Sequence, residues 1–378
     1  MASTSTTTES VAVANNHDET DAVLNANTKQ TYKPKESAFN QQKLPAWQPI
    51  LTAGTVMPAF FTFGLVFIPI GVGLVYFADN VKELSLDYTY CISNEQPDKT
   101  CAAIIDNSRQ MTCTCEIEFT LNEGIDGNVF IYYGLTNFYQ NHRRYVKSRD
   151  DMQLLGQLSS TVSMDCEDYD YATVDGVKKP IAPCGAIANS LFSDSFKIFS
   201  GNSSKEVPVL RTGIAWPSDR EVKFHNPPGP DLKEAFKNFA KPHDWRKNVW
   251  ELDLENPENN GFQNEDLIVW MRTAALPSFR KLHRRVNHEV EGYKDGLPAG
   301  NYSVHIDYNY PVVPFEGTKS LVFSNTSGLG GKNPFLGLCY LVTGALCLVL
   351  GITFLFIHLK WGKSTMDVIN VSPQTSYQ

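Results

Sequence analysis

Six cysteines are the residues best suited to covalent chemistry, and all lie in the middle of the chain. An even number of cysteines is typical of disulfide-linked domains in oxidising compartments. Their order does not decide which pairs form, although strain disfavours a bond between Cys113 and Cys115. One compact arrangement would nest a 101–113 pair inside a 91–115 pair and leave 166–184 separate. The group comprises Cys91, Cys101, Cys113, Cys115, Cys166 and Cys184.

A zinc knuckle is the alternative use of these thiols. Zinc sites usually space paired cysteines by about two to four residues. One residue separates Cys113 from Cys115, and nine separate Cys91 from Cys101. We therefore predict disulfides, with no metal ligand and no cofactor.

Three Asn-X-Ser/Thr sequons occur in the same part of the chain, at Asn202, Asn301 and Asn325. Each alone is a weak signal, but together with the cysteines they predict a glycosylated domain outside the cytosol.

No catalytic set stands out. The chain lacks a Walker loop, GxSxG, HExxH and GxGxxG. His283 and His288 are five residues apart, whereas a ligand pair on a helix is four apart. A solvated basic face is the simpler interpretation. The run NHRRYVKSRDD at 141–151 could bind a phosphate or carboxylate, but an ion network is favoured. We predict no enzyme activity.

Two long apolar segments lie on either side of the part of the chain that contains the cysteines and sequons. Residues 51–77 contain no charge, and residues 335–359 contain only His358 near their end. A bilayer core of about 30 Å needs about 20 helical residues, so both segments are long enough to span it. The expected order is a tail (1–50, of which 1–30 are disordered), a span, an exoplasmic or luminal domain (78–334), a span, and a tail (360–378).

Charge sets the expected orientation. Four lysines precede the first span and two follow the second, so the positive-inside rule places both termini in the cytosol. The net charge of −8 falls entirely on residues 78–334 and argues against a nucleic-acid binder. Residues 128–133, 302–308 and 319–324 predict strands, and residues 265–286 have helical character interrupted by Pro277. The fold class expected is a mainly antiparallel β domain with short helices between two transmembrane helices.

Small residues follow one face of the second span. Gly337, Gly344 and Gly351 recur every seven residues, which is nearly two helical turns. Such a stripe allows close helix approach in lipid. Its neighbour is either a partner's helix or the first span, and both alternatives stay open. Neither span carries the buried charge of a transport pathway, which indicates an accessory subunit.

Long irregular strings make this chain similar to the cell-division-control-fifty family, also called the transmembrane-protein-thirty family. The resemblance covers residues 31–360. The strings are SAFNQQKLPAWQP (37–49), GNVFIYYGLTNFYQNHRRYVKSRDD (127–151), PIAPCGAIANSLFSD (180–194), NNGFQNEDLIVWMRTAALPSFRKL (259–282), LPAGNYSVHIDYNYPV (297–312) and GGKNPFLG (330–337).

The resemblance implies a function. Members of that family are non-catalytic β subunits of type IV P-type ATPases, the flippases that move aminophospholipids from the exoplasmic to the cytosolic leaflet. They form a heterodimer with the catalytic subunit, let the complex leave the endoplasmic reticulum and support its phosphoenzyme cycle. The implied locations are the endoplasmic reticulum, Golgi, endosomes and plasma membrane.

The resemblance also assigns residues. The family's nested cysteine pairs match Cys91–Cys115 and Cys101–Cys113, and its third pair matches Cys166–Cys184. Asn301 lies near a family glycosylation position. Separately, the juxtamembrane segment 37–49 is poor in charge, and its Phe39 and Trp47 are candidate partner contacts if it extends along cytosolic loops of a partner. A receptor-like or adhesion ectodomain on two spans is the alternative function.

Overall fold

The structure is a computed structural model that describes residues 37–40, 42–44, 52–106, 112–201 and 205–362. The expected disorder of residues 1–30 lies outside the described residues.

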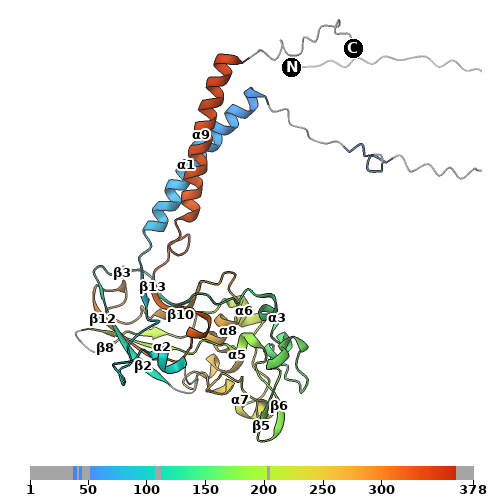
Figure 1. Cartoon of the computed structure of the whole chain (residues 1–378), viewed down its shortest axis with the longest axis vertical. Coiled ribbons are helices and arrows are strands. Elements are labelled where there is room, and N and C mark those ends of the chain that lie inside the picture. The colour runs from blue at the N-terminus through green and yellow to red at the C-terminus, as the bar shows by residue number, and fades with distance from the viewer. Residues whose placement is uncertain (1–36, 41, 45–51, 107–111, 202–204, 363–378) are drawn as a thin grey trace, which may run out of the picture. The chain divides into compact units, whose positions relative to one another are not determined.

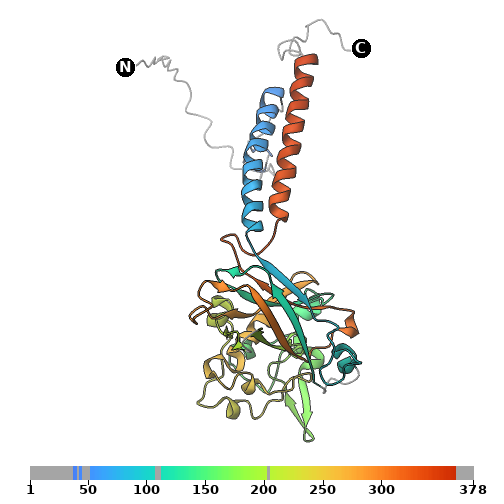
Figure 2. The same cartoon turned by 90° about the vertical axis from the view of Figure 1, so that its left-hand side faces the viewer.

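Two helices of 27 residues each carry most of the apolar sequence: α1 (Ala53–Asp79) and α9 (Phe335–Trp361). Both are long and apolar enough to cross a membrane. They cross in Figure 1 and run side by side in Figure 2, and their glycines bring them into contact. Because Gly64 lies near Gly344 and Gly71 lies near Gly337, the two helices run antiparallel.

The region between the helices is built on two antiparallel sheets. The larger has five strands in the order β1, β13, β4, β10, β9. Their bounds are β1 Glu83–Asp87, β13 Lys319–Ser324, β4 Phe130–Leu135, β10 Phe279–Val286 and β9 Val209–Leu210.

The second sheet has four strands in the order β2, β12, β7, β8. Along β12, buried and more exposed residues alternate, as expected for a strand with one face on a core. The bounds are β2 Cys113–Leu121, β12 Gly300–Tyr308, β7 Ser195–Ser200 and β8 Lys205–Glu206. Two small pairs complete the strands: β3 Ile125–Asp126 with β11 Gly296–Leu297, and β5 Tyr171–Val174 with β6 Val177–Pro180.

The strands β1 and β13 connect the domain to the helices. β1 follows α1, and β13 precedes α9. The two strands pair antiparallel, with Glu83 opposite Ser324. The chain therefore leaves one helix and returns to the other through neighbouring strands (Figure 2).

Two apolar cores support the sheets. The first contains side chains of both sheets, and the rings of Phe119 and Phe323 lie 5.2 Å apart within it. The second packs residues from the segment between β4 and β10 against the other end of β4, through Tyr133 and Leu135. The fully buried Trp270 lies in this second core.

Short helices occupy the connections. They are α2 Cys101–Asp106, α3 Arg143–Lys147, α4 Asp151–Leu154, α5 Ala186–Asn189, α6 Pro217–Val222, α7 Leu232–Ala235 and α8 Glu265–Met271, with 3₁₀ turns at Met164–Tyr169, Val249–Glu251, Pro257–Asn259, Gly261–Gln263 and Val313–Phe315.

The prediction of helix over 265–286 is half wrong. Asn264 caps α8 by accepting from the Leu267 amide at 3.1 Å, but the helix ends at Met271. After Pro277 the chain is strand β10, paired with β4. The expected fold class, a mainly antiparallel β domain flanked by two apolar helices, is confirmed.

Candidate functional site

Two disulfides fasten the loop after β1 to the start of β2. Cys91 bonds Cys115 across a Cα–Cα distance of 6.1 Å, and Cys101 bonds Cys113 across 5.4 Å. Cys113 and Cys115 are two residues apart on β2, so both side chains point to the same, buried face of the strand. Cys101 is the first residue of α2. These are the nested pairs that the resemblance implies.

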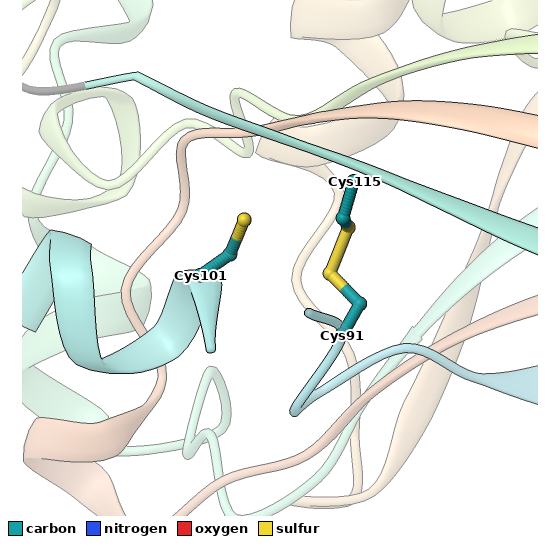
Figure 3. A group of neighbouring side chains, drawn as sticks. All are labelled: Cys91, Cys101 and Cys115. Atoms are coloured by element: carbon teal, nitrogen blue, oxygen red, sulfur yellow. A yellow bond between two sulfur atoms is a disulfide. The ribbon is translucent and has the colours of Figure 1, made fainter. Parts of the chain in front are cut away.

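Three sulfurs of this group come close enough to suggest a metal site. The sulfur atoms of Cys91, Cys101 and Cys115 lie within 4.8 Å of one another. Figure 3 shows Cys91 and Cys115 joined through their sulfurs, with Cys101 beside them. A metal is bound by the thiolate, and a sulfur held in a disulfide is no thiolate. The oxidised cluster therefore consists of covalent cross-links and is not a metal site.

The third disulfide joins Cys166 to Cys184 across a Cα–Cα distance of 5.8 Å. It encloses the β5–β6 hairpin and is buried with Ile181 and Ala240 in a small core of its own. The prediction of a disulfide-linked domain is confirmed.

The basic run at 141–151 forms local contacts. Arg149 and Asp151 are 2.9 Å apart, and Asp150 caps α4 by accepting from the amides of Met152 and Gln153. Beyond this single pair the run is not tested, and the ion network stays a prediction.

The two histidines do not form a pair. His288 is bound to backbone, accepting at Nε2 from the Val129 amide at 3.1 Å. His283 lies on β10, buried and facing a cavity.

The two described sequons differ in environment. Asn301 is exposed on β12, and its Oδ1 accepts from the Thr120 hydroxyl at 2.9 Å. Asn325 is partly buried; its Nδ2 donates to the Asp126 carbonyl and its Oδ1 accepts from the Lys82 amide. Asn202 lies outside the described residues.

The glycine stripe of α9 faces α1. Gly337, Gly344 and Gly351 are the buried residues of α9, and a Cβ added at Gly344 would lie 2.9 Å from Ile68 Cγ1. On α1, a Cβ at Gly71 would lie 3.0 Å from the Gly337 carbonyl oxygen. Of the two alternatives left open by the sequence, the structure has packing against the first span. The three glycines are therefore not on the surface that a partner could contact.

The outer surface of the helix pair remains apolar. Large side chains are exposed on both helices, among them Leu65, Ile70, Leu338, Leu346 and Ile352. In the juxtamembrane segment, Phe39 is 75% exposed within a short turn closed by the Lys43 amide on the Ala38 carbonyl. Trp47 lies outside the described residues.

Sequence reasoning missed a buried ion pair. Lys319 on β13 lies 2.6 Å from Asp194, and both side chains are fully buried. The Tyr88 hydroxyl donates to the same carboxylate at 2.9 Å, and the Lys319 ammonium lies over the Tyr308 ring. Because these residues are distant in sequence, no local pattern could have revealed the group.

These features define a class: a two-span membrane protein whose large domain, between the spans, is an antiparallel β structure fixed by disulfides. Residues 74–364 match the model of the LEM3 (ligand-effect modulator 3) family / CDC50 family, and the chain belongs to this family.

Animal and plant proteins are among its relatives. The chain is 49% identical to Cell cycle control protein 50A of Mus musculus over 343 residues, which is 89% of this chain and 92% of that protein. It is 46% identical to Cell cycle control protein 50B of Homo sapiens, over 90% and 98% of the two chains. It is 39% identical to ALA-interacting subunit 3 of Arabidopsis thaliana, over 88% of each.

Proposed function

We propose that this chain is a non-catalytic accessory subunit of a phospholipid-translocating P-type ATPase. Membership of the family supports this function, and so does the name of one relative, which describes a subunit that interacts with another protein. The observation that carries the proposal is the apolar, uncovered outer surface of the α1–α9 pair.

That surface suits a partner's membrane helices. The small residues of α1 and α9 are used against each other, so the outer surface presents large side chains such as Leu65 and Leu346. Helices in lipid associate through van der Waals packing rather than through a hydrophobic drive. A pair held together by its glycines can dock as one unit against a larger membrane subunit.

The β domain would act as a rigid cap on the exoplasmic side. Three disulfides restrict it, and neighbouring strands β1 and β13 connect it to both helices. In this proposal both termini are cytosolic, because two antiparallel spans return the chain to the side it started from. The sequons at Asn202, Asn301 and Asn325 carry glycans.

The chain would affect catalysis by changing how much each state of the partner's transport cycle is populated. Contacts that are stronger in one state of the transport cycle shift the cycle toward that state, whereas equal contacts shift nothing. In this proposal the chain forms a heterodimer with the ATPase and is needed for the complex to leave the endoplasmic reticulum. It then supports movement of aminophospholipids toward the cytosolic leaflet. The complex would work in the Golgi, endosomes and plasma membrane.

Co-purification of the full chain in mild detergent, followed by mass spectrometry, tests the proposal. The expected result is a P-type ATPase recovered in about equal amount, together with reduced uptake of labelled phosphatidylserine in cells lacking the chain. Recovery of the chain alone, with unchanged lipid uptake in such cells, would contradict it. Binding of a soluble or cell-surface ligand without any ATPase would favour a receptor instead.

A further inference from the structure

A cavity of about 380 Å³ opens beside β10, away from the disulfides and the helix pair. That volume falls within the range of small-molecule sites, about 300–1,000 Å³. Strand β10 supplies one wall, and the segment before β7, the 244–247 loop and the start of α8 supply the others. The lining includes His283, Arg211, Asp266, Tyr133, Phe192 and Ser193.

His283 is the most unusual side chain of the cavity. It is 7% exposed, and among the described residues neither ring nitrogen has a hydrogen-bond partner; Nδ1 is 4.0 Å from Asp266 Oδ1. Burial, and then the nearby Arg284 guanidinium, lower the pKa of His283 to about 3. The imidazole is therefore neutral, with one nitrogen that donates and one that accepts.

Arg211 lines the same cavity, and its side chain is 42% exposed overall. Its Nε is buried and has no hydrogen-bond partner within the described part of the chain. Its terminal nitrogens reach Asp253 and Asp266 only at 3.9 Å. A buried polar group without a partner is costly, about 1–3 kcal/mol, and each such group calls for an explanation. A ligand in the cavity would supply partners for His283 and Arg211.

The charges around the cavity limit what the ligand can be. Four basic residues and four aspartates contribute to the lining, so charges of both signs surround the cavity. Asp194 is paired with Lys319 and Asp266 with Arg284, each at 2.6 Å. A singly charged ligand would be attracted by the lining residues of opposite charge and repelled by those of like charge. An apolar ligand would leave His283 unsatisfied.

We propose that this cavity binds an uncharged, hydroxyl-rich molecule of monosaccharide size. A hydroxyl donates and accepts at once, as the neutral imidazole of His283 does. The aromatic side chains of Tyr133 and Phe192 contribute apolar surface beside it. The hydroxyl of Ser193 also lines the cavity and can both donate and accept.

Calorimetry on the full chain, with its ATPase partner if one co-purifies, tests the proposal. Nanodiscs replace sugar-based detergents, which would compete. The probes are methyl α-mannopyranoside and N-acetylglucosamine, with glycerol 3-phosphate and phosphoethanolamine as charged comparators. The expected result is saturable binding of at least one sugar with a Kd of about 1 mM or tighter. Failure of both sugars, or tighter binding of a charged comparator, would overturn it.

Three variants locate the binding. His283→Phe keeps an aromatic ring in the same place and should weaken sugar binding about tenfold, since one hydrogen bond is lost. Ser193→Trp, at an exposed lining position, should abolish it by filling the cavity. His305→Phe, the same change at a half-exposed histidine on β12 outside the cavity, should leave it unchanged. Full binding by Ser193→Trp would place the sugar elsewhere and overturn the proposal, whether or not His283→Phe folds.

Discussion

The Lys319 ammonium and the Asp194 carboxylate form a fully buried ion pair, 2.6 Å apart, that ties β13 to the segment before β7. The pair is well satisfied. Lys319 also donates to the Tyr310 carbonyl, and Asp194 accepts from the amides of Asn309 and Tyr310. It therefore fixes the end of one sheet against the other at a fully buried site.

Lys319→Met should strongly destabilise the domain. The change removes one charge and leaves Asp194 ionised without a counter-ion, and breaking such a pair typically costs about 3–5 kcal/mol. The double variant Lys319→Met/Asp194→Asn should recover part of that loss, because the new amide oxygen still accepts from the two backbone amides. Chemical unfolding of the three proteins measures both effects. A double variant no more stable than the single one would contradict this account.

Gly344→Leu should disrupt the helix pair. A Cβ at this position already lies 2.9 Å from Ile68 Cγ1 and 3.2 Å from the Ile68 amide nitrogen, so a leucine must push α1 away. Gly73→Leu is the matched control, since a Cβ there meets nothing within 4 Å. Thermal stability in detergent and recovery of the partner should fall for the first variant and stay near wild type for the second. Equal behaviour of the two would argue against internal packing.

Stability should rise with pH above neutrality because of Lys281. Its ammonium is buried and donates to the carbonyls of Val269, Trp270 and Arg272. Burial lowers the pKa of Lys281 to about 7, from 10.5 in its ordinary state. Between these values the unfolded chain holds the extra proton, so raising the pH favours the folded state.

The measurement compares unfolding at pH 7 and pH 9. The free energy of unfolding should increase by up to about 1.4 kcal/mol per pH unit from this group. Lys319, whose pKa burial lowers to about 8, adds a change of the same sign above that pH. Lys281→Met should reduce the slope and leave the part due to Lys319. An unchanged slope in that variant would show that Lys281 is not responsible.

The sequence predicted what depends on local pattern. Long uncharged runs indicate α1 and α9, and enrichment in β-branched and aromatic residues indicates β12 and β13. The sequence does not predict strand β10, because its buried positions include Lys281 and His283. Pattern rules assign such polar residues to the protein surface. The stretch that forms β10 was therefore joined to the apolar helix α8 before it.

Contacts between distant residues could not be predicted from pattern. Lys319 and Asp194 are 125 residues apart, and neither spacing nor composition links them. The stripe at Gly337, Gly344 and Gly351 was visible in sequence, but only the structure distinguishes α1 from a partner as its neighbour. The cavity beside β10 likewise combines segments that share no motif.

Cys166→Ser should impair folding of the domain. The Cys166–Cys184 bond closes a loop around the β5–β6 hairpin, and loss of a native disulfide typically costs about 2–5 kcal/mol. Cys339→Ser is the control, because Cys339 on α9 is free. Maturation of the attached glycans reports exit from the endoplasmic reticulum. Normal maturation of the Cys166 variant would refute the prediction.

Asn301 should carry a glycan whose removal leaves the fold intact. Its side chain is exposed on β12, and only its Oδ1 is engaged, by the Thr120 hydroxyl. Asn301→Gln should remove one glycan. The mass of the protein should fall by one glycan, and glycosidase treatment should no longer change the mass of the peptide that contains residue 301. Asn325→Gln should remove its glycan and also lower stability, because the Asn325 amide bridges Lys82 and the Asp126 carbonyl. If Asn301→Gln left the glycan mass unchanged, its sequon would be unoccupied, and the exoplasmic location of β12 would lose this support.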